Sequence, residues 1–339
     1  MNNEGLNFVR PKNFDSFFGQ KQIVNELKVY IYSANKRNEP LSHVLLYGPS
    51  GMGKTSLSFI IANETDSKIK VINAPMIETI QDLVEILASI NEKDILFIDE
   101  IHRLDRRIEE TLYSVMEDFV VNIPYKSGDN LKLIGVKIPK FTLIGATTLD
   151  GLISVPLKNR FPIQFHFENY NLNEMMQILI NNSKLYKLEI DEKCAKFFAA
   201  RTKNNPRILN NLLRRFSDYL LYFKISKVDL EVVEKFFKFI KIDEYGINDF
   251  DKKVIATLYE NFQDQPTSLE SIASLINENV YNIKENSEPY LVSIGFIRRT
   301  RRGRILTDRG KLFYWNNIKS WFLWKNALNY RKFMIIKKR

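Results

Sequence analysis

Three short apolar runs in the first half of the chain, each ending in small or polar residues, set the pattern of the fold. They are HVLLYG at 43–48, DILFIDE at 94–100 and FTLIGATT at 141–148. Continuous apolar runs of this length predict buried strands. A glycine-rich turn follows the first run, and the next segment, SLSFIIANE, has its apolar residues at helical spacing. Strand, turn and helix in this order predict an α/β fold.

The pattern becomes helical after residue 170 and mixed after residue 240. Apolar residues recur at helical spacing through 171–239, as in NEMMQILINNSKLYKL, which predicts a small all-α domain. The segment KIDEYGIND then reads as a linker. We therefore expect a large α/β domain at 1–167, a helical lid at 168–240, a third domain at 241–310 and a C-terminal tail at 311–339.

The third domain has the pattern of a winged helix. DFDKKVIATLYENF predicts one helix, and Thr267 three residues before Glu270 predicts a helix start with a capping box. VYNIKENSEPYL is the candidate recognition helix, which we expect to end near Pro289. Residues 296–300 and 304–307 predict two short strands joined by a tight turn at Gly303.

The hairpin expected at 120–140 is the other β element. Its segment VVNIPYKSGDNLKLIGVKIPK alternates apolar and polar residues around the turn residues SGDN. From the pattern alone, this hairpin either docks a partner or only covers a sheet edge.

The formal charge of +10 on this chain of 339 residues is concentrated near its C-terminus. Five of the seven residues from Arg298 to Arg304 are arginine, and from Pro289 to the end there are 14 basic residues and one acidic residue. Such a local field favours nucleic acid, an anionic membrane surface or an acidic protein, and a solubilising basic surface is the alternative. Because the arginines fall on the predicted wing, we interpret the anion as the DNA phosphate backbone.

Cysteine and histidine usage excludes several classes of protein. A single cysteine, Cys194, excludes a disulfide framework and predicts a small buried residue. With only three histidines, the composition argues against a structural zinc site. No apolar run approaches the ~18 residues of a membrane span, and MNNEGLNF is unlike a signal peptide, so we expect a cytoplasmic protein without a membrane span.

The turn GPSGMGKT at 48–55 matches the phosphate-binding loop G-x-x-x-x-G-K-[ST]. Gly51 and Gly53, on either side of Met52, let backbone amides wrap around phosphate oxygens, and the following helix points its positive end at them. Lys54 would reach the β- and γ-phosphates, and the Thr55 hydroxyl would ligate a magnesium ion. The predicted cofactors are ATP and Mg²⁺.

Polar residues also end the other two apolar runs. We expect Asp99 to hold the magnesium ion, and Glu100 to orient and deprotonate the attacking water. Thr147 and Thr148 stand where a polar side chain would contact the γ-phosphate or its water. These four residues, with Lys54, are the candidate catalytic set.

Two arginines are candidates for neutralising charge during phosphoryl transfer. Arg160 lies in VPLKNRFPI, and Arg207 lies in NNPRILNNLLRR, where Pro206 predicts a helix start with the arginine in its first turn. From the pattern alone, either arginine is equally well an ordinary surface residue.

Segments spread along the chain resemble, in order, the bacterial RuvB family of Holliday-junction branch-migration ATPases, in the AAA+ class. They are VRPKNFDSFFGQKQIV, GPSGMGKTSL, LFIDEIHRL, LYSVMEDF, FTLIGATT, PLKNRF, NNPRILNNLLRR, EPYLVSIGFI and RTRRGR. The resemblance runs from about Val9 to about Gly310. It implies a P-loop AAA+ ATPase domain, a small helical lid and a winged-helix head.

The same resemblance implies an ATP-dependent motor that drives branch migration in homologous recombination and repair. It would work as a homohexameric ring on the duplex DNA arms of a four-way junction. The implied partners are a RuvA-type junction-recognition protein, docked on the 120–140 hairpin, and a RuvC-type resolvase complex.

The resemblance also implies residue roles. Arg160 would be an arginine finger acting in trans on ATP bound by the neighbouring subunit, and Arg207 a sensor that couples the lid to the nucleotide. Arg299 and Arg304 match head-domain arginines that touch DNA. The remaining positions implied at the nucleotide site are Val9 and Arg10 beside the base, Gly51, Lys54, Thr55 and Ser56 at the phosphates and magnesium, and Glu117, Asp118, Phe119 and Tyr170 around the pocket.

Three positions depart from the family pattern. Leu149 follows the double threonine where the family usually has arginine, Pro162 replaces a glycine, and Val280 replaces a third DNA-contacting arginine. Two other functions are alternatives: a clamp-loader-like ATPase that remodels a protein ring, and a non-catalytic DNA-binding module that only senses ATP. For the aromatic tail, the alternatives are a membrane or partner contact and extra core packed on the head.

Overall fold

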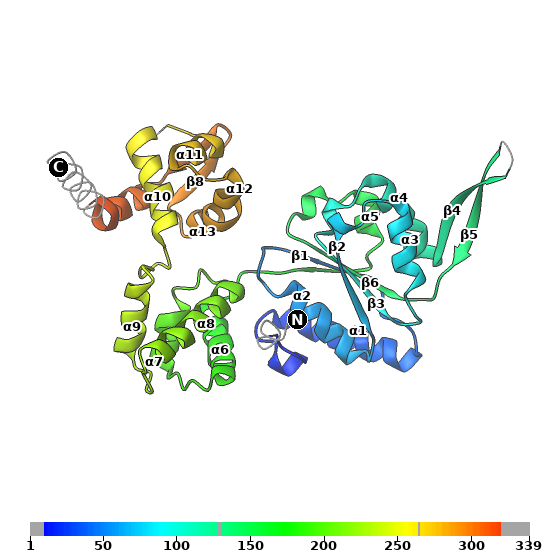
Figure 1. Cartoon of the computed structure of the whole chain (residues 1–339), viewed down its shortest axis with the longest axis horizontal. Coiled ribbons are helices and arrows are strands. Elements are labelled where there is room, and N and C mark those ends of the chain that lie inside the picture. The colour runs from blue at the N-terminus through cyan, green and yellow to red at the C-terminus, as the bar shows by residue number, and fades with distance from the viewer. Residues whose placement is uncertain (1–9, 128–129, 264, 320–339) are drawn as a thin grey trace, which may run out of the picture. The chain divides into compact units, whose positions relative to one another are not determined.

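The computed structural model describes residues 10–127, 130–263 and 265–319, and Figure 1 shows the course of the chain. The chain forms two compact units, divided between Asp229 and Leu230. None of the helices in the described ranges has the length and apolar character needed to cross a membrane.

A five-stranded sheet forms the centre of the first unit. Its order is β2 (Ile69–Asn73), β3 (Ile95–Asp99), β6 (Thr142–Thr147), β1 (Val44–Tyr47) and β7 (Ile163–His166), and all neighbouring strands are parallel. The three apolar runs of the sequence are the adjacent central strands β1, β6 and β3, so the prediction of buried strands is confirmed. Tyr47 pairs with Thr147, which places the carboxyl ends of β1 and β6 at one edge of the sheet.

Helices cover both faces of this sheet. Figure 1 shows α1 (Lys21–Arg37) and α2 (Lys54–Glu64) on one face, and α3 (Ile80–Ala88), α4 (Arg106–Asp118) and α5 (Val155–Asn159) on the other. Phe97 and Ile98 point to opposite faces of β3 and are both fully buried, as expected for a covered parallel sheet. Short 3-10 turns fill the connections: Phe14–Ser16, Ala74–Met76, Ile101–Arg103, Asp150–Leu152 and Lys184–Tyr186.

The predicted hairpin is present as β4 (Val120–Ser127) and β5 (Asn130–Lys137). These strands are antiparallel, with Val120 opposite Lys137 and Ser127 opposite Asn130. The hairpin projects from the body of the α/β domain (Figure 1). Ile134 and Val136 on β5 are exposed.

Helices follow the sheet, as predicted. They are α6 (Leu172–Ser183), α7 (Glu192–Ala199) and α8 (Pro206–Tyr222), while α9 (Leu230–Phe239) begins the second unit. Cys194 on α7 is buried. The prediction for α8 is confirmed, because this helix begins at Pro206 and its N-cap, Asn205, accepts hydrogen bonds from the amides of Arg207 and Ile208.

The second unit contains the predicted winged helix. Its helices are α10 (Asp249–Thr257), continued by a π turn to Phe262, α11 (Leu269–Ile276), α12 (Val280–Asn282), a π turn (Ile283–Ser287), α13 (Glu288–Ser293) and α14 (Asp308–Phe313). The antiparallel strands β8 (Ile297–Thr300) and β9 (Gly303–Leu306) form the wing. Gly303 has a φ of 140°, and a Cβ there would collide with the backbone of Thr267.

Two local predictions in this unit are wrong. The N-cap of α11 is Ser268, not Thr267, because the backbone of Thr267 exchanges hydrogen bonds of 2.9 and 2.7 Å with Arg304 on the wing. The helical segment also continues past Pro289 to Ser293. Proline stands in the first turn of α13, where the N–H that it lacks would have no partner within that helix.

The core of the head extends to Ile318. Phe313, Tyr314 and Ile318 are buried in the same cluster as Phe296 and Leu306, and the π turn Tyr314–Ile318 continues α14. For residues 311–319, extra core is therefore the correct alternative. The rest of the predicted tail lies outside the described residues.

Candidate active site

Three glycines bend the loop between β1 and α2 into a phosphate-binding conformation. Gly48, Gly51 and Gly53 have φ values of 136°, 83° and 101°, in a region that side chains rarely adopt. Lys54 begins α2, and its buried ammonium donates to the carbonyls of Gly48 at 2.7 Å and Pro49 at 3.0 Å. Burial lowers the pKa of Lys54 to about 8, against the opposing charges of Glu100 and Asp99. A bound phosphate would add negative charge and further stabilise the protonated form of this lysine.

The loop opens into a pocket of about 450 Å³. The α/β domain contributes Arg10, Ser50, Gly51, Gly53, Lys54, Thr55, Ser56, Asp99, Glu100 and Thr148, and the helical segment contributes Tyr186, Pro206, Arg207, Asn210, Asn211 and Arg214. The sequence-predicted phosphate, magnesium and water-activating residues therefore share one pocket. It lies at the carboxyl ends of the strands, where open α/β sheets bind ligands.

The carboxylates of Asp99 and Glu100 stand at the end of β3. Burial, and then the neighbouring Glu100 charge, raise the pKa of Asp99. Glu100 has a left-handed backbone with a φ of 50°. This bend turns the chain sharply after the strand, and both side chains line the pocket.

Hydrogen bonds fix the position of the Glu100 carboxylate. Thr148 Oγ1 donates to it at 3.1 Å, and Nδ1 of His102 lies 3.3 Å from it. The same nitrogen lies 2.9 Å from Thr147 Oγ1, which in turn accepts from the amide of Leu149. Thr147 is fully buried and Thr148 lines the pocket, so the two threonines occupy different environments.

The residues present suit a magnesium ion. Thr55 and Asp99 line the same pocket, and a cation would offset the cost of burying the Asp99 carboxylate. Within the described ranges, no three His, Cys, Asp or Glu side chains converge to hold a metal. An ion held by these two residues would complete its shell with phosphate oxygens and water, as magnesium commonly does.

Apart from Tyr186, the lid residues that line the pocket lie at the start and on one face of α8. Arg207 Nη1 donates to Ser50 Oγ at 3.2 Å, and Asn205 Nδ2 donates to the carbonyl of Ser50 at 2.9 Å. Asn210, Asn211 and Arg214 follow Arg207 at intervals of three, four and seven residues, which is one face of a helix. Sequence reasoning missed these three and Tyr186, although this spacing from Arg207 could have identified the helical ones.

Several predicted nucleotide-site residues do not line the pocket. Tyr170 is buried and donates to the carbonyl of Met52 at 2.9 Å, so it supports the loop from behind. Arg10 does line the pocket, with its guanidinium 5.0 Å from the Phe59 ring. Val9 lies outside the described residues.

Glu117 and Asp118 end α4, Phe119 is its C-cap, and none of the three lines the pocket as the structure describes it. The Arg160 Nη2 atom lies 3.2 Å from the Glu117 carboxylate. Phe119 adopts a left-handed conformation after the helix and packs edge-on against Phe141 in the core. Arg160 is absent from the lining of the subunit's own pocket as the structure describes it.

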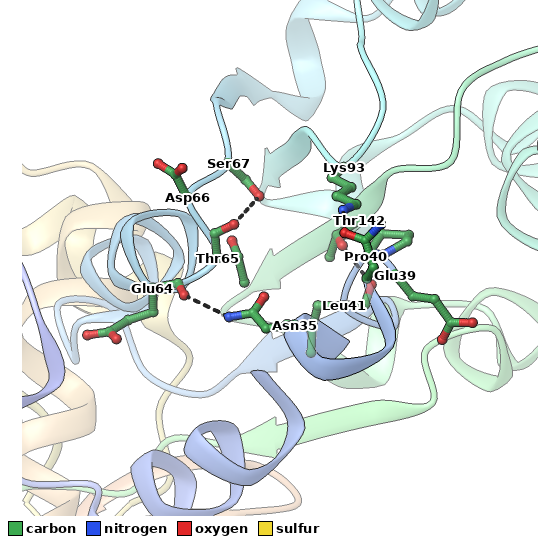
Figure 2. A pocket seen from close by; sticks show the side chains of 11 residues that line it. Asn35, Glu39, Pro40, Leu41, Glu64, Thr65, Asp66, Ser67, Lys93 and Thr142 are labelled. Atoms are coloured by element: carbon green, nitrogen blue, oxygen red, sulfur yellow. Dashed lines mark hydrogen bonds between the residues drawn. The ribbon is translucent and has the colours of Figure 1, made fainter. Parts of the chain in front are cut away.

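A second pocket, of about 240 Å³, lies at the opposite edge of the sheet (Figure 2). Its lining includes the segments that precede β1, β2 and β3 and the start of β6. Polar groups there bond to one another: Asn35 Nδ2 donates to the Glu64 carbonyl at 3.3 Å, and Ser67 Oγ donates to the Thr65 carbonyl at 3.2 Å (Figure 2). It contains none of the phosphate-loop residues, so the first pocket is the candidate active site.

The wing is the candidate nucleic-acid interface. Arg299 and Arg304 stand directly opposite each other on β8 and β9. Their Nε atoms lie 2.8 and 2.7 Å from one oxygen of Glu288, whose side chain is only 1% exposed. Arg298, Arg301 and Arg302 are exposed. The two predicted DNA contacts are therefore held by a buried carboxylate that sequence reasoning missed.

A phosphate loop after β1, an acidic pair at the end of β3, with β6 between these two strands, and a lid arginine define a P-loop ATPase of the AAA type. Models of RuvB domains match the chain in this order. They are the Holliday junction DNA helicase RuvB P-loop domain at 9–167, the RuvB AAA lid domain at 170–243 and the RuvB C-terminal winged helix domain at 244–314. The chain belongs to the RuvB family, and it is an ATP hydrolase.

Relatives of known name span nearly the whole chain. A Kosmotoga olearia protein named Holliday junction branch migration complex subunit RuvB is 44% identical over 301 residues, covering 89% of this chain and 88% of that protein. Its Pediococcus pentosaceus namesake is 43% identical over 307 residues, covering 91% of each. The solved structure of the Thermotoga maritima RuvB Holliday junction branch migration motor matches with a TM-score of 0.80 at 38% identity, covering 89% of this chain and 97% of that one.

Proposed function

We propose that this protein is an ATP-driven motor that moves the branch point of four-way DNA junctions, working as a hexameric ring around duplex DNA. The observation that carries the proposal is that one chain combines a pocket lined by the phosphate loop, Asp99 and Glu100 with a winged helix whose wing is rich in arginine. The names of its relatives supply the branch-migration substrate. Homologous recombination and repair are the processes in which such a motor acts, in the cytoplasm.

ATP hydrolysis would begin with phosphates seated on the loop amides of Gly51 and Gly53. Lys54 would exchange its bonds to the loop carbonyls for the β- and γ-phosphates. Thr55 and Asp99 would hold magnesium, which neutralises developing phosphate charge when bound. Glu100, oriented by Thr148, would take the proton of the attacking water. Ser56, Arg10 and Val9 complete the proposed set that contacts the nucleotide, with Tyr170 behind the loop.

Arg160 is proposed to act on the ATP of the neighbouring subunit. Its absence from the lining of its own pocket supports this role. Because Glu117 pairs with Arg160, Glu117 and its chain neighbours Asp118 and Phe119 would approach the same neighbouring nucleotide. Arg207 would report the nucleotide state to the lid, since it already contacts the phosphate loop through Ser50.

The wing would grip the phosphate backbone without reading sequence. Arg299 binds Glu288 through Nε, and Arg304 binds it through Nε and Nη2. Both arginines keep further terminal N–H groups that can bind phosphate. A motor that moves along DNA requires such sequence-independent contacts. A clamp-loader-type switch would instead be expected to end in a helical collar.

The projecting hairpin is the surface proposed for a partner protein. The exposed Ile134 and Val136 give the projecting hairpin an apolar face suited to a RuvA-type junction-recognition protein. A RuvC-type resolvase would join the assembled complex. These partners follow from the family name of a branch migration complex subunit.

Translocation can be tested on linear duplex DNA that carries an annealed third strand. We expect ATP-dependent displacement of the third strand, stimulated by the RuvA-type protein, and none with the Glu100→Gln variant. A ring-remodelling switch would hydrolyse ATP and leave the third strand in place. That outcome would overturn the proposal of a motor.

A further inference from the structure

Arg160 does not extend freely into solvent, because three contacts restrain the guanidinium. It lies over the Tyr113 ring with its central carbon 4.2 Å from the ring centroid. Nη1 donates to the Pro156 carbonyl at 3.0 Å, and Nη2 donates to Glu117 at 3.2 Å. The Nε atom is buried and has no hydrogen-bond partner. Only 23% of the side chain is exposed.

These contacts leave a defined part of the guanidinium available. Each terminal nitrogen of an arginine carries two N–H groups, and one on each is used by Pro156 or Glu117. The free pair of N–H groups is what a phosphoryl group would bind. A buried Nε without a partner is costly, so packing against the Tyr113 ring must hold it there.

The Tyr113 ring is itself held by a group of hydrogen bonds. Its hydroxyl donates to Glu109 Oε1 at 2.6 Å and lies 3.1 Å from Ser154 Oγ, and Ser154 also bonds to Glu109. Glu109 and Tyr113 are one turn apart on α4, whereas Ser154 is the N-cap of α5, the helix that leads to Arg160. The same cluster therefore connects the helix carrying the ring to the helix carrying the arginine.

We propose that Tyr113 is a positioning residue for catalysis in the neighbouring subunit: its ring face fixes the plane and direction of the Arg160 guanidinium. A planar guanidinium stacks favourably on an aromatic face, and stacking restricts the rotation that would misdirect its free N–H groups. Accurate placement matters because small displacements of a catalytic group cost large factors in rate. This inference rests on the proposed role of Arg160 as a finger in trans.

Single variants give the first readout. Tyr113→Leu removes the aromatic face and is expected to lower kcat about tenfold while nucleotide affinity in the same subunit stays near that of the parent. Tyr113→Phe keeps the face and loses only the hydroxyl contacts, so it should retain most of the rate. Tyr32→Leu is the matched control, since it removes a ring that lies beside Lys36 on α1.

Mixed rings distinguish positioning from a structural role. Tyr113→Leu subunits keep an intact Lys54, and Lys54→Ala subunits keep intact Tyr113 and Arg160. In random equal mixtures, about a quarter of the head-to-tail interfaces combine the two intact halves. We therefore expect hydrolysis to recover to about a quarter of the parent rate, as it should for Arg160→Ala mixed with Lys54→Ala under the same proposed function.

Each outcome is decisive. Recovery in both mixtures supports the proposal. Recovery with Arg160→Ala but not with Tyr113→Leu, in rings verified by mass, overturns it and leaves the trans-acting arginine in place. Recovery in neither mixture overturns the trans role of Arg160, and the inference about Tyr113 falls with it. Parent-like kcat in Tyr113→Leu alone also overturns the inference.

Discussion

Replacing Arg304 by alanine should destabilise the winged-helix head more than replacing Arg299. Arg304 gives the buried Glu288 carboxylate two hydrogen bonds, at 2.7 and 3.4 Å, whereas Arg299 gives it one, at 2.8 Å. The Arg299 side chain is 55% exposed and that of Arg304 only 26%. Loss of Arg304 leaves the buried Glu288 carboxylate with one hydrogen bond, from Arg299. Loss of Arg299 leaves it with both hydrogen bonds from Arg304.

The expected magnitudes follow from these contacts. Charge-assisted bonds to a buried group contribute more than neutral ones, so Arg304→Ala should cost about 3 kcal/mol of unfolding free energy. Arg299→Ala should cost about 1 kcal/mol, because solvent screens the exposed partner. Arg302→Ala, at the exposed turn of the wing, is the control and should stay within about 0.5 kcal/mol.

Urea unfolding followed by tryptophan fluorescence measures the unfolding free energy of the second unit, which contains the winged-helix head. All three tryptophans lie at positions 315, 321 and 324, and Trp315 contacts Tyr259 of the head core. Because the first unit contains no tryptophan, the signal reports on the second unit alone. Equal losses for the two arginine variants, or no loss for Arg304→Ala, would refute the anchoring role of Glu288.

The same experiment has a defined pH dependence. Burial alone would raise the pKa of Glu288, but hydrogen bonds from Arg304 and Arg299 outweigh it and hold the pKa below the ordinary value. A group with a depressed carboxyl pKa stabilises the fold at neutral pH, and that contribution is lost as pH falls below the ordinary glutamate range. The gap between the parent and Arg304→Ala should therefore shrink in acid. A gap that widens in acid would contradict the ion-pair account.

Three further predictions concern the active site, the core and the wing. Glu100→Gln should keep ATP and magnesium binding but slow hydrolysis by a factor of roughly 10² or more, whereas Lys54→Ala should weaken nucleotide binding itself; turnover and nucleotide titration separate the two. His43 is buried and accepts a hydrogen bond from Leu143 N, and burial lowers its pKa to about 4. The first unit should therefore lose up to ~3 kcal/mol of unfolding free energy as pH falls from about 6.5 to about 4. Urea unfolding followed by circular dichroism measures this loss, and an unfolding free energy that does not change over this pH range would contradict the prediction. Arg299→Ala should lower the slope of log affinity against log salt by about 0.9, equally on unrelated duplexes, and an unchanged slope would remove Arg299 from the phosphate contacts.

The chemistry at the strand ends could be predicted because the motif spacing and the strand pattern agree. Lys54, Thr55, Asp99 and Glu100 each follow an apolar run, and parallel strands bring their carboxyl ends to one edge. The structure accordingly gathers all four in one pocket.

Contacts between distant segments could not be predicted in this way. Thr147 and Thr148 read alike in sequence, but Thr147 is the buried last residue of β6, whereas Thr148 follows the strand and lines the pocket. His102 lies in a quoted motif, yet only its three-dimensional position next to Glu100 gives it a role. The helix start near Thr267 was misplaced because its backbone pairs with Arg304, some 37 residues further along the chain.

The burial of charged side chains was the hardest feature to predict from the sequence. Glu288 precedes a proline and looks like an ordinary surface residue of a helix start, whereas the fold buries it beneath two arginines. Arg160 was similarly ambiguous, and the Tyr113 ring beneath it has no signature in spacing, since it comes from another helix.

The most direct test of the central claim is ATP-dependent branch migration on a synthetic four-way junction with mobile arms. The purified protein, with a RuvA-type junction-recognition protein, is predicted to convert the junction into duplex products only when ATP and magnesium are present. The same mixture with the Glu100→Gln variant should bind the junction and leave it intact. Active hydrolysis with no conversion of the junction, under conditions where both proteins are bound to it, would contradict the account.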